Sequence, residues 1–260
     1  MEIVSSRKNA NVRFLRLFLR EKHARDEHGI FAVEGDHLCG ELLRAGFKVT
    51  YAAYTEKAAA KYPETVKLLA EKADNVIVIT EELSEYISDT GSPQGLFATA
   101  EIRGWADAVS ALDENARKIV VLDGVQDPGN VGTVIRSAEA LGADGAVLLH
   151  GCADIWSPKT LRASMGSAFR LPVINASADD LPKLLSGFAV YGAMLDDSAK
   201  RLGEVKFPEK TAVVIGSEGA GISPEVAELC DEKIYIPIKG AESLNAATAA
   251  AIILWELGKT

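Results

Sequence analysis

Three turns rich in glycine and asparagine hold most of the residues that could do chemistry, and each follows an apolar run typical of a buried strand. They span residues 123–132, 213–221 and 236–245. Glycine lets the backbone approach a ligand closely, and the Asn, Glu, Ser and Arg side chains in or just after the turns supply hydrogen-bonding groups. Because ligands of parallel sheets bind outside the carboxyl ends of the strands, these turns together predict one ligand-binding site.

Each turn also has a purely structural interpretation. Asn130 is placed to cap the helix that follows the first turn, and Arg136, one turn inside that helix, to form a surface ion pair. Ser223 and Pro224 fit a helix start after the second turn, and the third turn leads into a tight helix of small residues from Ala246. Helix capping does not explain why three glycines fall within six residues of the second turn.

Helix and strand patterns alternate along the chain, which predicts an α/β fold. We expect a first domain over 1–105, a linker over 106–117 and a second domain over 118–260. In the first, the expected helices are 12–27, 36–45, 63–72 and 81–88, and the expected strands 31–33, 49–54, 76–79 and 96–102. In the second, the expected strands are 118–123, 145–150, 188–195, 211–216 and 233–238, and the expected helices 131–141, 157–168, 179–186, 223–230 and 243–258. The second set of strands is typical of a parallel sheet buried on both faces.

The charge of the chain is unevenly distributed. The net charge is −9, yet residues 1–30 hold seven Lys or Arg against four acids and so carry +3. A local basic stripe is what RNA phosphates require, although a solvated helix face has the same composition. The candidate RNA-binding residues are Arg7, Lys8, Arg13 and Arg25.

Several classes of protein are disfavoured by the sequence. The first residues lack the apolar core of a signal peptide, and no apolar stretch is long enough to span a bilayer, so we expect no membrane association. The three cysteines are odd in number and far apart, which indicates a reducing cytoplasm. The four histidines form no metal-binding set, and the chain contains neither a dinucleotide fingerprint nor a phosphate-binding loop.

Taken together and in order, the motifs resemble the SpoU/TrmH family of RNA ribose 2′-O-methyltransferases, in the SPOUT class. The three matches are Asn130-x-Gly132-x3-Arg136, Ile215-Gly216-x-Glu218-x2-Gly221, and Ile236-Pro237-Ile238 followed by Ser243-Leu244-Asn245. They cover residues 118–260, whereas residues 31–35 and 93–95 resemble the family's L30e-like substrate-binding domain. Two segments depart from the usual pattern, residues 9–13 and 245–248, where relatives often carry Asn-Pro-x-Val-Lys and Asn-Val-Ser-Val.

The resemblance implies S-adenosylmethionine (SAM) as methyl donor with no metal, a deep trefoil knot in the C-terminal domain, and a homodimer. It places the catalytic residues around the reacting ribose, and these are Asn130, Arg136, Glu218, Ser243 and Asn245. It places the cofactor-binding residues in the second and third turns, and these are Gly216, Ser217, Ile236, Pro237, Leu244 and Asn245. Methyl transfer to a hydroxyl needs in-line approach and loss of a proton, so Arg136 either clamps a neighbouring phosphate or acts as the base.

The sequence therefore favours a cytoplasmic, SAM-dependent methyltransferase that modifies a ribose of structured RNA, with ribosomal RNA as first substrate and transfer RNA as second. One alternative is an RNA-binding or assembly factor that holds SAM without turnover. Another is a nucleotide-dependent enzyme of the Rossmann type, against which the missing glycine fingerprint argues. Housekeeping and antibiotic-resistance roles fit the motifs equally.

Overall fold

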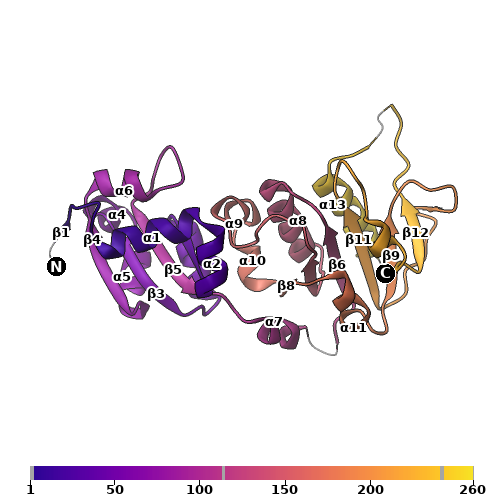
Figure 1. Ribbon diagram of the computed structural model, residues 1–260, viewed down its shortest axis with the longest axis horizontal. Coiled ribbons are helices and arrows are strands. Elements are labelled where there is room, and N and C mark those ends of the chain that lie inside the picture. The colour runs from indigo at the N-terminus through magenta and orange to yellow at the C-terminus, as the bar shows by residue number, and fades with distance from the viewer. Residues whose placement is uncertain (1–2, 113–114, 241–242, 260) are drawn as a thin grey trace. The chain divides into compact units, whose positions relative to one another are not determined.

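The computed structural model describes residues 3–112, 115–240 and 243–259 (Figure 1). Residues 113 and 114 of the expected linker, and 241 and 242 of the third turn, lie outside the described residues. The contacts between residues divide the chain into two compact units. Unit 1 comprises Met1–Arg103 and Trp156–Phe169, and unit 2 comprises Gly104–Ile155 and Arg170–Thr260.

Unit 1 is built on a five-stranded mixed sheet in the order β1-β4-β3-β5-β2. Its strands are β1 (Ile3–Val4), β2 (Ile30–Glu34), β3 (Val49–Tyr54), β4 (Asn75–Ile79) and β5 (Leu96–Glu101). Its helices are α1 (Ala10–Arg20), α2 (Lys22–His28), α3 (Asp36–Arg44), α4 (Glu56–Lys61), α5 (Pro63–Lys72), α6 (Glu81–Ile87) and α9 (Pro158–Ser164). Strand β5 runs antiparallel to β2 and β3, whereas β4 runs parallel to β1 and β3.

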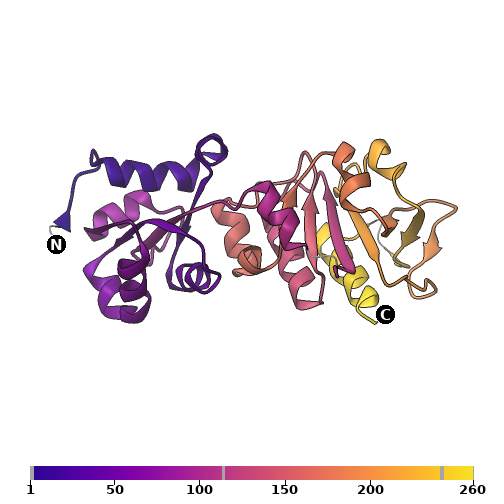
Figure 2. The same ribbon diagram turned by 90° about the horizontal axis from the view of Figure 1, so that it is seen from below.

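The apolar stripe expected over 12–27 forms the helical side of the core of unit 1. Val12, Leu15, Phe18 and Leu19 are buried and pack with residues of the sheet and of α6. The single helix expected over 12–27 is two helices, because the backbone of Glu21 is extended and separates α1, which carries the whole stripe, from α2. Figure 2 shows α1, in indigo, lying along one side of the sheet of unit 1.

Aromatic side chains fix the segment Trp156–Phe169 within unit 1. The rings of Phe31 and Trp156 lie 4.5 Å apart, and those of Phe47 and Phe169 lie 5.5 Å apart. Phe31 and Phe169 are almost fully buried. Contacts of this kind between rings add to the hydrophobic stabilisation of a core, so this part of the sequence contributes to the core of unit 1 although most of its neighbours along the chain belong to unit 2.

Unit 2 contains a seven-stranded sheet in the order β10-β12-β9-β11-β6-β7-β8, in which all described pairs are parallel. Its strands are β6 (Lys118–Asp123), β7 (Gly145–Leu148), β8 (Val173–Asn175), β9 (Ala189–Ala193), β10 (Lys200–Arg201), β11 (Thr211–Gly216) and β12 (Glu232–Tyr235). Its helices are α7 (Trp105–Ala111), α8 (Pro128–Ala140), α10 (Ser167–Arg170, which begins in unit 1), η1 (Ala178–Asp180), α11 (Leu181–Leu184), α12 (Pro224–Ala227) and α13 (Ala246–Leu257). The predictions of an α/β fold and of a buried parallel sheet are confirmed.

Candidate functional site

The first two turns leave neighbouring strands at the same level of the sheet. Strands β6 and β11 pair so that Asp123 lies opposite Gly216, and these are the last residues of the two strands. Strand β9 lies on the other side of β11, and β12 pairs with β9 so that Ile234 lies opposite Ala193. The carboxyl ends of four adjacent strands therefore meet at one edge, which is where parallel sheets bind ligands.

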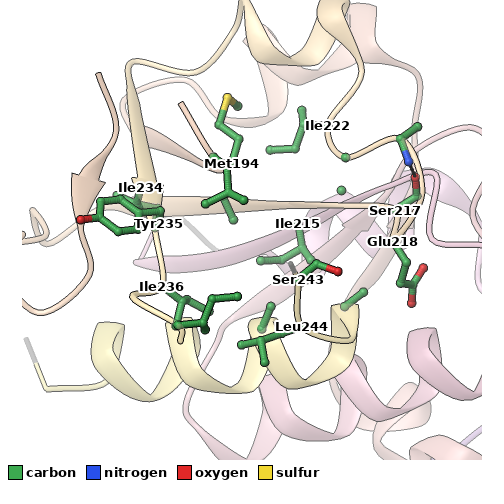
Figure 3. Close-up of a pocket in the computed structure, with 18 residues that line it drawn as sticks. Met194, Ile215, Ser217, Glu218, Ile222, Ile234, Tyr235, Ile236, Ser243 and Leu244 are labelled. Atoms are coloured by element: carbon green, nitrogen blue, oxygen red, sulfur yellow. Dashed lines mark hydrogen bonds between the residues drawn. The ribbon is translucent and has the colours of Figure 1, made fainter. Parts of the chain in front are cut away.

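A cavity of about 370 Å³ opens at this edge (Figure 3). Its walls come from the turn after β9, the end of β11 with its turn, the end of β12 and the first residues around α13. The lining residues are Ala193, Met194, Leu195, Ile215, Gly216, Ser217, Glu218, Ala220, Gly221, Ile222, Ile234, Tyr235, Ile236, Ile238, Ser243, Leu244, Ala246 and Ala249. Small-molecule sites commonly have volumes of about 300–1,000 Å³ and mostly apolar walls with a few polar groups, which describes this cavity.

The turn after β11 is closed so tightly that only glycine fits at its first position. The amide of Ser217 donates to the carbonyl of Gly221 at 3.0 Å, and the amide of Gly221 donates back at 2.9 Å. A Cβ atom on Gly216 would lie 2.1 Å from the carbonyl carbon of Gly221, well inside any real contact. The glycine thus permits a narrow turn that carries Ser217 and Glu218 to the cavity.

A chain of side-chain hydrogen bonds joins all three turns. Asn245 Nδ2 donates to Asn130 Oδ1 at 3.0 Å, and Asn130 Nδ2 in turn donates to Glu218 Oε1. Asn245 also caps α13, since its Oδ1 accepts from the amides of Ala247 at 3.0 Å and Thr248 at 3.2 Å. Three residues that lie far apart in the sequence are therefore brought together at the rim of the cavity, as one site requires.

The capping interpretation of Asn130 is wrong. Helix α8 begins after Asp127, whose Oδ1 accepts from the amide of Asn130 at 2.9 Å. Asp127 thus satisfies one of the unpaired amides of the first helical turn, which leaves the Asn130 side chain to link the turns. After the second turn, Ser223 caps α12 and Pro224 occupies its first position, which confirms that prediction.

The other candidate residues divide into those that line the cavity and those that do not. Ile236, Ser243 and Leu244 line it, whereas Pro237 does not, and Asn245 reaches the site through its contact with Asn130. Arg136 lies on the exposed side of α8. Among the hydrogen bonds and ion pairs of the described residues, none engages its guanidinium, so the expected surface ion pair is absent there.

Sequence reasoning missed the wall of the cavity that follows β9. Met194 and Leu195 line it, and Leu195 is 74% exposed, unusual for a leucine. The turn is held by Asp196, which accepts from Lys233 Nζ at 2.7 Å and from the amide of Ser198 at 2.9 Å. These hydrogen bonds, the one from Lys233 foremost, hold the pKa of the Asp196 carboxyl below its usual range. The sequence contained a signal for this wall, because Met194 and Leu195 are the last residues of the predicted strand 188–195, and ligands bind at the carboxyl ends of parallel strands.

Two half-buried thiols lie close to the turns of unit 2. Cys152 Sγ donates to the carbonyl of Leu122 at 3.2 Å, near the end of β6. Burial raises the pKa of the Cys152 thiol, and burial together with the nearby Asp231 carboxylate raises the pKa of Cys230 to about 11. Both groups are therefore neutral thiols near pH 7, and neither behaves as an activated nucleophile.

The candidate RNA-binding residues of unit 1 have different environments. Arg7, Lys8 and Arg13 are exposed, and Arg7 forms an ion pair with Glu82 at 3.1 Å. Arg25 is only 4% exposed, and its Nη1 donates to the carbonyl of Phe18 at 2.7 Å. The prediction for Arg25 is wrong in physical terms, because a guanidinium buried against the helix backbone is not available to a phosphate.

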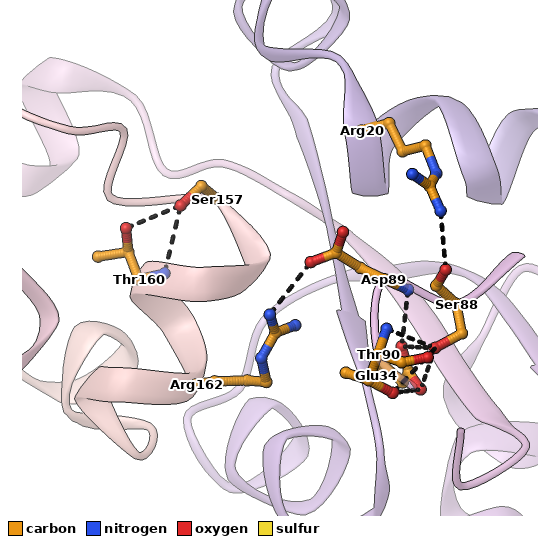
Figure 4. A network of polar contacts seen from close by, with 8 residues as sticks. All are labelled: Arg20, Glu34, Ser88, Asp89, Thr90, Ser157, Thr160 and Arg162. Atoms are coloured by element: carbon orange, nitrogen blue, oxygen red, sulfur yellow. Dashed lines mark hydrogen bonds and ion pairs between the residues drawn. The ribbon is translucent and has the colours of Figure 1, made fainter. Parts of the chain in front are cut away.

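A buried carboxylate organises the loop that precedes β5 (Figure 4). Glu34 is 9% exposed and accepts from Ser88 Oγ at 2.7 Å and from Thr90 Oγ1 at 3.1 Å. On the outer side, Arg20 Nη2 donates to the carbonyl of Ser88 at 2.9 Å, and Arg162 pairs with Asp89 at 3.1 Å. These bonds fix the loop in unit 1 at the place where two arginines reach the surface.

The residues that the structure describes contain no group of three or more His, Cys, Asp or Glu side chains placed to hold a metal ion. They also contain no helix of sufficient length and apolarity to cross a membrane.

An all-parallel sheet with a cavity at the carboxyl edge of its strands, preceded by a separate mixed α/β unit, is the architecture of an α/β protein that binds a small molecule. The chain belongs to the SpoU rRNA methylase family, whose sequence model matches residues 117–255. The model of an MRM3-like substrate binding domain matches residues 9–98. The resemblance to SpoU/TrmH proteins is therefore confirmed, as is the presence of a substrate-binding domain before the methylase domain.

Individual proteins align with the chain over nearly its whole length. It is 33% identical to the 23S rRNA (guanosine(2553)-2′-O)-methyltransferase RlmP of Bacillus subtilis, covering 99% of both chains. A crystal structure of an AdoMet-bound rRNA methyltransferase from Sinorhizobium meliloti superposes with a TM-score of 0.88 at 29% identity, covering 99% of this chain and 97% of that one. The SpoU methyltransferase AviRb from Streptomyces viridochromogenes, in complex with AdoMet, superposes with a TM-score of 0.85 at 27% identity, covering 97% and 98%.

Proposed function

We propose that this chain transfers a methyl group from SAM to the 2′-hydroxyl of a ribose in ribosomal RNA. The observation that carries the proposal is the hydrogen-bonded junction of Asn245, Asn130 and Glu218 at the rim of the cavity. It brings together one polar residue from each of the three motifs on which the family resemblance rests. The relatives RlmP and AviRb support the choice of substrate class and donor, respectively.

The cavity fits the proposed donor. Its narrow glycine turn, where a side chain at Gly216 would collide with backbone, allows close approach of a flat or extended ligand. Ile236 and Leu244 offer apolar contact, and Ser217 offers a hydroxyl and backbone groups. Pro237 and Asn245 contribute at the edge of the cavity by fixing the backbone of the third turn. When bound, SAM supplies an electrophilic methyl group on a sulfonium.

The remaining motif residues act on the ribose. Methyl transfer forms a bond from the ribose oxygen to the methyl carbon and breaks the bond from that carbon to sulfur, which leaves as a neutral thioether. The hydroxyl proton passes to water. Ser243, which lines the cavity two residues before Asn245, hydrogen-bonds the sugar. Arg136, on the exposed side of α8, is assigned to a phosphate next to that sugar, because a guanidinium binds phosphate with two parallel hydrogen bonds. Orientation of the hydroxyl is its main contribution.

The proposal extends to the rest of the molecule. Arg7, Lys8 and Arg13 contact the RNA from unit 1, where their side chains are exposed. A homodimer is supported by the outer side of α13, on which Ile252 and Trp255 are 37% and 60% exposed. The proposal also includes a deep trefoil knot in the C-terminal domain, as in the family. It includes a cytoplasmic location, which the three unpaired cysteines support.

The test is methylation of total RNA from cells that lack this chain, with purified protein and SAM that carries a labelled methyl group. We expect label at one ribose of ribosomal RNA with the wild-type protein and a loss of about 10²-fold or more in rate with Arg136→Ala, a range typical for a group that orients reactants. If label appeared in transfer RNA alone, the substrate would be transfer RNA and not ribosomal RNA. SAM binding without transfer to any RNA would indicate a binding or assembly factor instead.

A further inference from the structure

Arg136 has one potential competitor for phosphate on its own helix. Within α8, Glu139 is the single acidic residue, and it follows Arg136 by three positions. Side chains at this spacing are neighbours on a helix surface, where opposite charges attract. A free Glu139 carboxylate would therefore draw the Arg136 guanidinium into an ion pair and would repel an approaching phosphate.

Glu139 is held by another residue. Arg170, the last residue of α10, donates from Nε to Glu139 Oε1 at 2.5 Å and from Nη2 to Oε2 at 2.9 Å. Both carboxylate oxygens are engaged in this bidentate pair, the strongest geometry for a guanidinium and a carboxylate. The side chain of Glu139 is 29% exposed and that of Arg170 is 41% exposed. No such bond is formed by Arg136 among the described residues.

We propose that Arg170 is a positioning residue for the reaction: by holding both oxygens of Glu139, it keeps Arg136 available to the RNA phosphate. The inference rests on the proposed function, because it assigns Arg136 to a phosphate. Arg170 itself touches neither substrate nor donor. The other role open to the pair is to hold Arg170 against α8 within unit 2, and the two roles predict different results for substitutions that break the same pair.

Arg170→Gln and Glu139→Gln both break the pair, but only the first leaves a free carboxylate beside Arg136. We expect Arg170→Gln to lower the single-turnover methylation rate at saturating SAM by about two- to threefold, the loss of available Arg136 expected for an ion pair at helical spacing. Glu139→Gln should retain the wild-type rate, and Arg170→Gln combined with Glu139→Gln should recover it. Equal losses in all three proteins would overturn the proposal and leave a structural tie.

A second measurement needs neither RNA nor SAM. Phenylglyoxal modifies arginines, and a guanidinium paired with a carboxylate reacts more slowly. Peptide mass spectrometry should show Arg136 modified about two- to threefold more slowly in Arg170→Gln than in wild type, and at the wild-type rate in Glu139→Gln. Equal rates in Arg170→Gln and wild type would refute the inference.

Two controls separate this inference from folding effects and from the proposed function. Thermal unfolding should show that both single variants remain folded at the assay temperature, because the pair is partly exposed and such pairs contribute little to stability. Arg170→Lys keeps a positive charge without the bidentate geometry, and it should lie between wild type and Arg170→Gln in both assays. If wild-type protein methylates no RNA, the proposed function fails, and the labelling of Arg136 still decides whether Arg170 controls its availability.

Discussion

Gly216→Ala is the substitution whose effect follows most directly from the geometry. The added Cβ would lie 2.1 Å from the carbonyl carbon of Gly221, 2.3 Å from its oxygen and 2.3 Å from the amide nitrogen of Ile222. All three are backbone atoms, so no side chain can rotate away to make room. The turn that carries Ser217 and Glu218 must therefore move as a whole.

The required movement can be worked out from contact distances. Ordinary contact to a Cβ begins at 3.4 Å, so the backbone of Gly221 must retreat by about 1.3 Å from its position at 2.1 Å. Overpacking of this kind typically costs about 1–3 kcal/mol of stability. The lower entropy of the unfolded chain with alanine returns only about 0.4–1 kcal/mol. A displacement of about 1 Å at a reacting centre can lower a rate by about 10²-fold.

The chain contains a matched control in the same turn. At Gly219 an added Cβ would have no atom within 4 Å, and the backbone there is not left-handed, so alanine should be accommodated. We expect Gly216→Ala to weaken SAM binding at least about tenfold by calorimetry and to slow methyl transfer by about 10²-fold. Gly219→Ala should match wild type in both. If the two variants bound SAM equally well, the reasoning from the tight turn would be refuted.

Three further predictions concern other parts of the molecule. Asn130→Ala breaks two hydrogen bonds of the junction but removes no residue that lines the cavity. The rate of methyl transfer should therefore fall at least about tenfold in a labelled-SAM assay, while the Kd for SAM stays near that of wild type. An equally large loss of SAM affinity would contradict this expectation. Glu34→Ala leaves the buried hydroxyl of Ser88 and the half-buried hydroxyl of Thr90 without the carboxylate that accepts from them. It should lower the free energy of unfolding by about 1–3 kcal/mol in urea titration, whereas Glu85→Ala, at an exposed position, should change it by less than about 0.5 kcal/mol. Because the pKa of Cys230 is raised to about 11, its reaction with iodoacetamide in native protein should be slow at pH 8 and accelerate up to pH 11; labelling at pH 8 as fast as in urea would contradict its burial.

Strand and helix positions could be read from the sequence where the local signal and the tertiary environment agree. The predicted strands 49–54, 118–123 and 211–216 and the predicted helix 63–72 have the observed bounds, because unbroken apolar runs and a proline at a helix start are local signals. The predicted helix 157–168 was wrong as one element. It is divided where Met165 and Gly166 adopt left-handed backbone, which nothing in the local pattern reveals.

The short strands β1, β8 and β10 were missed, since a strand of two or three residues shows no period, and the helix α4 was missed because six residues cover less than two helical turns. Helix α7 likewise occupies the start of the expected linker. At the site, the motif residues could be named from sequence, but the bond between Asn245 and Asn130 spans 115 positions and follows only from the fold. The burial of Arg25 could not be foreseen either, because its charge pattern is that of an exposed helix face.

The placement of Trp156–Phe169 within unit 1 constrains how members of such a family could exchange their substrate-binding domains. A recombination that replaced only the N-terminal part would place different side chains against Trp156 and Phe169, whose rings pack against Phe31 and Phe47 in this protein. Chimeras joined at residue 103 should therefore be less soluble than chimeras that also import residues 156–169. The part of the gene that must be exchanged to change the substrate-binding domain is then two separate segments, which encode residues 1–103 and 156–169.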